Sequence, residues 1–423
     1  MKALLDIVAR HKRGERVGVY SLCSAHPLVI EAAMREAVKT NTALLIEATC
    51  NQVNQFGGYT GMKPADFRAF VERIADATRL PRERLLLGGD HLGPNVWQKE
   101  PAESALQKAD DLVDQYVAAG FRKIHLDCSM ACADDPVPLP EALIASRAAR
   151  LAAVGEEAAQ RAGGELPVYV IGTEVPVPGG AHEDLAELEV TRPEAALATI
   201  SAHRKAFEAA RLGDAWTRVI ALVVQPGVEF DHHKVIDYQP GKARALTACI
   251  EHERQFVFEA HSTDYQTPEA LAQLVRDHFA ILKVGPGVTF ALRETLWALA
   301  AIESDMPAIE KKSDLRATAL RVMRAQPAQW RAHYHDKKNE SFDLAYSLSD
   351  RIRYYWPDPE VTAACDTLLA NLRRQPPPLT LVSQYLPRQY AAVRARELEP
   401  VVDSLLRAGV AAAIRPYIEA CGA

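Results

Sequence analysis

Eight short apolar runs, separated by longer stretches with helical periodicity, occupy the first 300 residues of the chain. Each run is rich in Val, Ile and Leu, which is typical of parallel strands buried on both faces. The runs begin, in chain order, at Val17, Ala43, Arg84, Lys123, Val168, Arg218, Gln255 and Ala280. Eight strand–helix units in succession predict an α/β fold, the closed (β/α)8 TIM barrel.

Proline introduces several of the helical stretches, where its missing N–H needs no partner. These prolines are Pro27, Pro64, Pro101, Pro193 and Pro268. Thr191 and Thr267 precede two of them and are candidate helix N-caps. A doubly wound open sheet is the alternative fold, but no glycine-rich dinucleotide fingerprint follows any strand. The pattern therefore favours the barrel.

The strand pattern stops near residue 305, and the rest of the 423-residue chain reads as helices. A barrel needs about 250 residues, so the chain has room for an addition. We expect a barrel over residues 1–305 and a helical extension over residues 306–423. The extension is predicted to pack on the barrel and on a neighbouring copy of the chain, as a homo-oligomer.

Composition excludes several partners and compartments. The net charge of −6 comes without a basic block, which argues against nucleic acid as a partner. No apolar run approaches the roughly 20 residues that span a bilayer, and the N-terminal segment becomes charged too early for a signal peptide. The seven cysteines lack zinc-type spacing and are interpreted as reduced thiols. We expect a cytoplasmic protein with a small-molecule substrate.

Polar residues cluster at the predicted carboxyl ends of the strands, where barrels of this type build their active sites. Glu47 and Glu259 belong to this set without an assigned role, and His125 is interpreted as a barrel or interface residue. Asp90, Asp127 and Glu174 are the predicted catalytic residues. The predicted substrate contacts are Asn51, Gln55, Gln225, Lys283, Gly285, Arg351 and Arg353.

A metal site is predicted from the same strand ends. Carboxylates brought within a few ångström of each other need a compensating cation or substrate. Imidazoles beside carboxylates suit Zn²⁺, with Mn²⁺ and Co²⁺ as alternatives. A lone histidine is more often structural, but His91 and His261 stand at matching strand ends. We predict His91, His261 and Glu174 as ligands, with Asp127 as a further candidate.

Arg351 and Arg353 lie in the segment SDRIRYYW of the helical extension. Two arginines among aromatic residues are compatible with simple helix packing. They are equally compatible with an extension that folds over the barrel mouth and supplies a guanidinium contact to a phosphate.

The segments GGDHLGPN, GTEVPVPGG, FEAHSTDY, KVGPG and SDRIRYYWP carry a family resemblance over essentially the whole chain. The sequence resembles the Z subunits of tagatose-bisphosphate aldolase, the GatZ/KbaZ-like family, also labelled in places as tagatose-6-phosphate kinase. More remotely it is similar to metal-dependent class II aldolases. The resemblance implies that Asp90 is a catalytic acid or base, and that His91 and His261 are metal ligands. It also implies a histidine after the sixth strand, where Gln225 stands instead.

The resemblance leaves two functions open. In the first, the chain is a metal-dependent epimerase that interconverts tagatose and fructose forms at C4 by retro-aldol cleavage and re-addition. The substrate is then D-tagatose 6-phosphate or free tagatose. In the second, the chain is a non-catalytic partner that stabilises a class II aldolase subunit. A kinase is not expected, because no GxxxxGK[ST] motif or kinase glycine loop is present.

Overall fold

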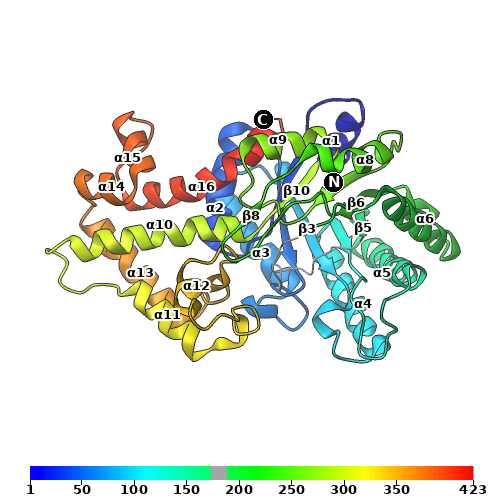
Figure 1. Ribbon diagram of the computed structural model, residues 1–423, viewed down its shortest axis with the longest axis horizontal. Coiled ribbons are helices and arrows are strands. Elements are labelled where there is room, and N and C mark those ends of the chain that lie inside the picture. The colour runs from blue at the N-terminus through cyan, green and yellow to red at the C-terminus, as the bar shows by residue number, and fades with distance from the viewer. Residues whose placement is uncertain (173–187, 423) are drawn as a thin grey trace.

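The computed structural model describes residues 1–172 and 188–422, and its eight parallel strands close into a barrel (Figure 1). Around the barrel the order is β1-β2-β3-β4-β5-β6-β9-β10, and β10 pairs with β1. The strands are β1 (Val19–Leu22), β2 (Leu44–Thr49), β3 (Leu85–Leu92), β4 (Lys123–Leu126), β5 (Val168–Gly172), β6 (Val219–Val224), β9 (Val257–Ala260) and β10 (Ile281–Val284). The prediction of a closed barrel rather than an open sheet is confirmed.

Helices follow the strands and form the outer layer of the barrel (Figure 1). They are α2 (Pro27–Thr40), α3 (Pro64–Thr78), α4 (Ala102–Ala118), α5 (Glu141–Ala162), α6 (Pro193–Ala209), α8 (Pro240–Ile250), α9 (Pro268–Arg276) and α10 (Pro286–Asp305). A short helix α7 (Gly213–Trp216) and a small hairpin of β7 (Glu229–Phe230) and β8 (Val235–Ile236) are added between them.

Most of the predicted helix starts are found, with one correction. Thr267 caps α9, because its side chain accepts a hydrogen bond from the amide of Ala270. Thr191 does not cap α6, whose N-cap is Arg192. Its hydroxyl instead accepts a hydrogen bond from the amide of Gln225 at 2.8 Å, which ties the segment before α6 to the end of β6.

The N-terminal helix α1 (Lys2–Lys12) closes one end of the barrel. Its buried side chains Leu4 and Val8 pack with Leu45, Val170 and Ile281 from inside the barrel. A second and larger apolar core lies between the strands and the surrounding helices. Because α1 fills the amino end of the barrel, the interior is reached from the carboxyl end, where the polar residues gather.

The C-terminal region is helical, as expected, and returns to the barrel. Its helices are α11 (Leu315–Ala325), α12 (Glu340–Tyr346), α13 (Pro359–Arg374), α14 (Leu379–Tyr385), α15 (Pro387–Arg394) and α16 (Val402–Ala420). Helix α16 runs back against α2, α9 and α10 (Figure 1). There the hydroxyl of Tyr417 donates to the carbonyl of Thr263 at 2.6 Å. None of the helices in the described residues is long and apolar enough to cross a membrane.

Candidate active site at the carboxyl ends of the strands

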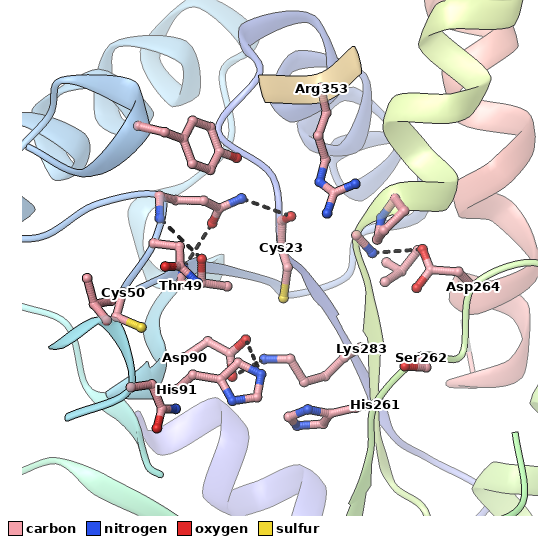
Figure 2. A pocket seen from close by; sticks show the side chains of 18 of the residues that line it. Cys23, Thr49, Cys50, Asp90, His91, His261, Ser262, Asp264, Lys283 and Arg353 are labelled. Atoms are coloured by element: carbon pink, nitrogen blue, oxygen red, sulfur yellow. Dashed lines mark hydrogen bonds and ion pairs between the residues drawn. The ribbon is translucent and has the colours of Figure 1, made fainter. Parts of the chain in front are cut away.

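A cavity of about 390 Å³ opens at the carboxyl end of the barrel. Its walls bring together Asp90, His91, His261, Lys283 and Arg353, which come from four different parts of the chain (Figure 2). Figure 2 shows the two histidines, Asp90 and Lys283 on one side of the cavity and Arg353 on the other. The ends of the third and seventh strands, which carry His91 and His261, therefore meet at one cavity, and Lys283 of the eighth strand lies beside them.

An irregularity in β3 turns two consecutive side chains toward this cavity. In a regular strand, Asp90 and His91 would point to opposite faces. Between Gly89 and Leu92 the register with β4 shifts by one residue, and His91 adopts a left-handed backbone conformation with φ of 50°. Such a bulge re-aims side chains and is common beside active sites. Both Asp90 and His91 consequently line the cavity.

A buried ionic network joins the cavity to the barrel interior. The Lys283 Nζ lies 2.6 Å from Asp90 Oδ1 and 2.6 Å from Glu47 Oε2. Deeper in the barrel, the Lys123 Nζ lies 2.7 Å from Glu47 Oε1 and 2.7 Å from Glu259 Oε2. Buried charges are tolerated only when they are paired in this way. The two lysines thus bridge three carboxylates across the barrel.

The network holds Lys283, Asp90 and Glu259 in their charged forms. Burial alone would lower the pKa of Lys283, but Asp90 and the neighbouring carboxylates raise it well above its usual value. Burial alone would raise the pKa of Asp90, but His91 and Lys283 hold it well below its usual range. In the same way, Lys123 and His261 outweigh burial and lower the pKa of Glu259. Lys283 is therefore a cation in the cavity wall, and Asp90 an anion.

Three imidazoles meet beside this network, and each is oriented by a carboxylate. The His91 Nδ1 lies 2.8 Å from Asp127 Oδ2, the His125 Nδ1 3.0 Å from Asp90 Oδ1, and the His261 Nε2 3.0 Å from Glu259 Oε1. An ionised carboxylate only accepts, so each of these ring nitrogens is a donor, and when the ring is neutral its opposite nitrogen carries a lone pair. Carboxylate–histidine pairs of this kind orient metal ligands.

The tautomer of His125 decides which of its nitrogens faces the cluster. The amide of His91 also points at the Nδ1 of His125, at 3.3 Å. We assign the proton to Nδ1, because the Asp90 contact is shorter and an ionised carboxylate cannot donate. Burial lowers the pKa of His125, which keeps the ring neutral. Its Nε2 is buried and has no hydrogen-bond partner among the described residues.

These groups fit a divalent cation. Asp90, His125, Glu259 and His261 each offer one ligand atom, and those atoms lie within 4.8 Å of one another. The rings of His91, His125 and His261 form a triangle with centroid separations of 5.0, 5.1 and 5.4 Å. Among the described residues, the carboxylates of Glu47, Asp90 and Glu259 meet the two ammonium groups of Lys123 and Lys283, and the fourth carboxylate, that of Asp127, meets His91. The cluster thus has an excess of negative charge that a divalent ion would offset.

The structure distributes the sequence-predicted residues over several places. Asp127 stands behind His91, where its carboxylate also accepts from Asn95 and Ser129 and does not line the cavity. The interaction with His91 lowers the pKa of Asp127 despite burial, so it positions His91 as an anion. Glu174, predicted as a ligand and catalytic residue, lies outside the described residues.

Two of the predicted substrate contacts lie away from the cavity. The side-chain amide of Gln55 donates to the carbonyl of Lys108 at 2.8 Å, and the residue is buried behind its own loop. The Oε1 of Gln225 accepts from the amides of Gly227 and Val228 and shapes the turn after β6. Asn51 lines the cavity and is exposed.

The carboxylate of Asp264, from the loop after β9, lies at the N-terminus of α10 beside Gly285. Both residues line the cavity. The Oδ1 of Asp264 accepts from the amide of Gly285 at 2.9 Å and from the amide of Gly287 at 2.7 Å. A helix N-terminus attracts anions, and here the chain's own carboxylate takes that place. Burial raises the pKa of Asp264 to about 6.

The two arginines of the extension have different surroundings. Arg351 is buried, stacks over Tyr354 and donates to the carbonyl of Gln329. Arg353 also lies over the Tyr354 ring, 4.5 Å from its centroid, and lines the cavity. It donates to backbone carbonyls and to the Tyr354 hydroxyl, and no carboxylate among the described residues forms an ion pair with it. Of the two, Arg353 is placed to meet an anionic ligand.

A family model described as "D-tagatose-1,6-bisphosphate aldolase subunit GatZ/KbaZ-like" matches residues 4–422 of this chain. The chain belongs to this family. A crystal structure of a probable tagatose 6 phosphate kinase from Sinorhizobium meliloti 1021 is 50% identical in sequence, with a TM-score of 0.88. That match covers 96% of this chain and 100% of the other. A fructose-bisphosphate aldolase from Campylobacter jejuni is 13% identical, with a TM-score of 0.45, over 87% of this chain and 91% of that one.

In this GatZ/KbaZ-like chain the third imidazole of the cluster comes from β4. The resemblance implies a histidine after the sixth strand, but Gln225 stands there. The third ring beside His91 and His261 is that of His125, which is buried. No role was predicted from the sequence for Lys123, Glu47 or Glu259. One signal was available: a charged residue inside a strand buried on both faces has to meet an opposite charge. Applied to the strand runs, that rule singles out Glu47, Glu259 and Lys283, whereas Lys123 stands at the start of its run.

Proposed function

We propose that this chain is a metal-dependent 4-epimerase of tagatose catabolism, which converts D-tagatose 6-phosphate, or free tagatose, to the fructose form. The reaction proceeds by retro-aldol cleavage and re-addition. The observation that carries the proposal is the Asp90–Lys283 ion pair in the cavity wall beside three oriented imidazoles. A barrel with a purely supporting role would gain stability from apolar residues at these positions.

Asp90 takes up and returns the proton, and Lys283 supplies positive charge. Asp90 accepts the proton of the C4 hydroxyl, and the C3–C4 bond breaks to leave an aldehyde on the C4 fragment. The electron pair of that bond stays on the C1–C3 fragment, where the Lys283 ammonium offsets the charge. The aldehyde turns and presents its other face, the bond reforms, and Asp90 returns its proton to the C4 oxygen. A divalent metal held by His125, His261 and His91, when bound, supplies Lewis-acid stabilisation of that charge.

Arg353 sets the orientation of the substrate. It lies across the cavity from Asp90 and His91 (Figure 2), where a phosphate at C6 would meet its guanidinium. A ketose bound in this way places its C4 hydroxyl toward the Asp90–Lys283 ion pair. Free tagatose lacks the phosphate, so a comparison of the two substrates measures the contribution of Arg353.

The proposal is tested with D-tagatose 6-phosphate that carries deuterium at C4. Purified protein is incubated with this substrate and Zn²⁺, Mn²⁺ or Co²⁺, and fructose 6-phosphate is followed by NMR. Retro-aldol epimerisation never breaks the C4–H bond, so the product keeps its deuterium. The Asp90→Asn variant is expected to lose about a hundredfold in rate. Loss of the deuterium would contradict the mechanism, and absence of turnover with all three metals would contradict the function.

A supporting role in a two-protein aldolase is the second candidate, because the family description names an aldolase subunit. It predicts no turnover by the purified chain. It also predicts a stable complex with a class II aldolase subunit and a longer half-life of aldolase activity in that complex. Co-expression followed by gel filtration separates the two candidates, because an epimerase acts without the second protein.

Asp264 is expected to make anion binding at Arg353 dependent on pH. With a pKa of about 6, Asp264 is protonated below pH 6 and negatively charged above it. The affinity for sulfate, whose own charge is constant, should fall about fivefold between pH 5 and 7.5, since one opposing charge is worth about 1 kcal/mol. Calorimetric titration measures this change. The isosteric Asp264→Asn variant keeps the acceptor for Gly285. Its sulfate affinity should change by less than twofold between pH 5 and 7.5.

A further inference from the structure

A second cavity, of about 460 Å³, adjoins the first and is called the side cavity here. It lies between the loop after β1, the loop after β2 and the helical extension. The two cavities share Cys23, Gln52, Tyr59 and Arg353 as a common wall. Nothing in the proposed epimerase reaction uses the side cavity, so it needs its own explanation.

The side cavity is mostly apolar, although Arg353, Asp366 and Arg373 also line it and Arg373 pairs with Asp403 at 2.7 Å. Large apolar and aromatic side chains line it, namely Leu28, Met62, Phe70, Trp356 and Leu369. A free sugar would find few partners for its hydroxyl groups on such walls, whereas a planar apolar group would exclude water from them. The lining therefore favours a ligand with an aromatic or aliphatic body.

Two hydrogen-bond donors on its walls, His26 and Arg353, favour a ligand with an anionic group. The Nδ1 of His26 accepts the amide of Leu28 at 3.3 Å, and burial lowers the pKa of His26 to about 4. The ring is then neutral with its proton on Nε2, and that nitrogen has no hydrogen-bond partner among the described residues. The ring stands edge-on to Trp356, with 5.9 Å between centroids. Arg353 adds a guanidinium that forms no ion pair with any described carboxylate.

We propose that the side cavity is a second binding site, which takes a small anion with an apolar or aromatic body. The body packs against Trp356 and Phe70, the His26 Nε2–H donates to the ligand, and the anionic group binds Arg353. Because Arg353 belongs to both cavities, this ligand and an anion bound in the first cavity exclude each other. The side cavity is thus a site for competitive inhibition by aromatic phosphates or carboxylates.

The test compares three probes by calorimetry on the full-length protein. Phenylphosphonate carries both the ring and the charge, methylphosphonate only the charge, and benzyl alcohol only the ring. Phenylphosphonate is expected to bind at one site, at least tenfold more tightly than either of the others. Sulfate is expected to displace it competitively. Equal affinities for phenylphosphonate and methylphosphonate would overturn the proposal.

Two substitutions locate the bound ring. Leu28→Trp fills the side cavity and should weaken phenylphosphonate binding at least tenfold, with methylphosphonate binding unchanged. Leu197→Trp makes the same change at an exposed position on α6 and should leave both affinities unchanged. If circular dichroism shows that Leu28→Trp does not fold, Met62→Trp fills the same space from the loop after β2. Phenylphosphonate affinity that survives the filling variant would place the ring in the first cavity and refute the proposal.

Discussion

Replacement of Lys123 by Met is expected to lower the free energy of unfolding by about 3–5 kcal/mol. Lys123 is fully buried inside the barrel, with its Nζ 2.7 Å from both Glu47 Oε1 and Glu259 Oε2. Methionine has a similar length but no charge. The substitution therefore leaves two buried carboxylates with one cation fewer, and the desolvation of those carboxylates is no longer compensated.

Urea denaturation at pH 7 measures this effect, because the chain offers a matched control. Arg82 forms an ion pair with Asp76 at 2.7 Å on the surface, where both side chains are exposed. Arg82→Met should cost less than about 1 kcal/mol, as exposed pairs contribute little. Adding Glu259→Gln to Lys123→Met should recover part of the loss by removing one unpaired charge. A Lys123→Met variant as stable as the control would contradict the ionised network.

The sequence predicts the barrel well because burial on both faces leaves a strong local pattern. Each strand run is almost purely apolar, and each of the eight runs forms a strand of the closed sheet. The strand ends carry the polar residues, so the meeting of His91 and His261, at 5.1 Å between ring centroids, also follows from the pattern. These features depend on local composition and on the one global property of barrel closure.

The rest of the site depends on geometry that a local pattern does not encode. The bulge in β3 shifts the register by one residue, and without it Asp90 and His91 would face opposite sides. Lys123 meets Glu47 and Glu259 only because closure brings β2, β4 and β9 around one interior. Gln55 illustrates the opposite case: a polar residue after a strand turns back to bond the carbonyl of Lys108.

Replacement of His125 by Ala is expected to weaken divalent-metal binding by more than a hundredfold. His125 was interpreted from the sequence as a barrel or interface residue, but its buried Nε2 has no partner among the described residues, and His125 belongs to the set of converging ligand residues. Asp90 holds the opposite nitrogen as a donor. Loss of a direct ligand should exceed the 10–100-fold that loss of an orienting carboxylate typically costs. Asp127→Asn, which releases His91, should therefore fall in that smaller range.

Competition for Zn²⁺ with a chromophoric chelator measures these affinities without reference to catalysis. His203→Ala is the control, since His203 is also buried, on α6, and its Nδ1 lies 2.9 Å from the carbonyl of Thr199 and 4.0 Å from Glu141. Its removal should leave Zn²⁺ affinity unchanged. If His91→Ala abolishes binding while His125→Ala does not, the ligands are those predicted from the sequence, His91, His261 and Glu174. The ranking of Zn²⁺ affinities among the variants thus identifies which imidazoles bind the ion. Replacement of a ligand should lower the affinity most, and replacement of the carboxylate that orients it should lower the affinity less.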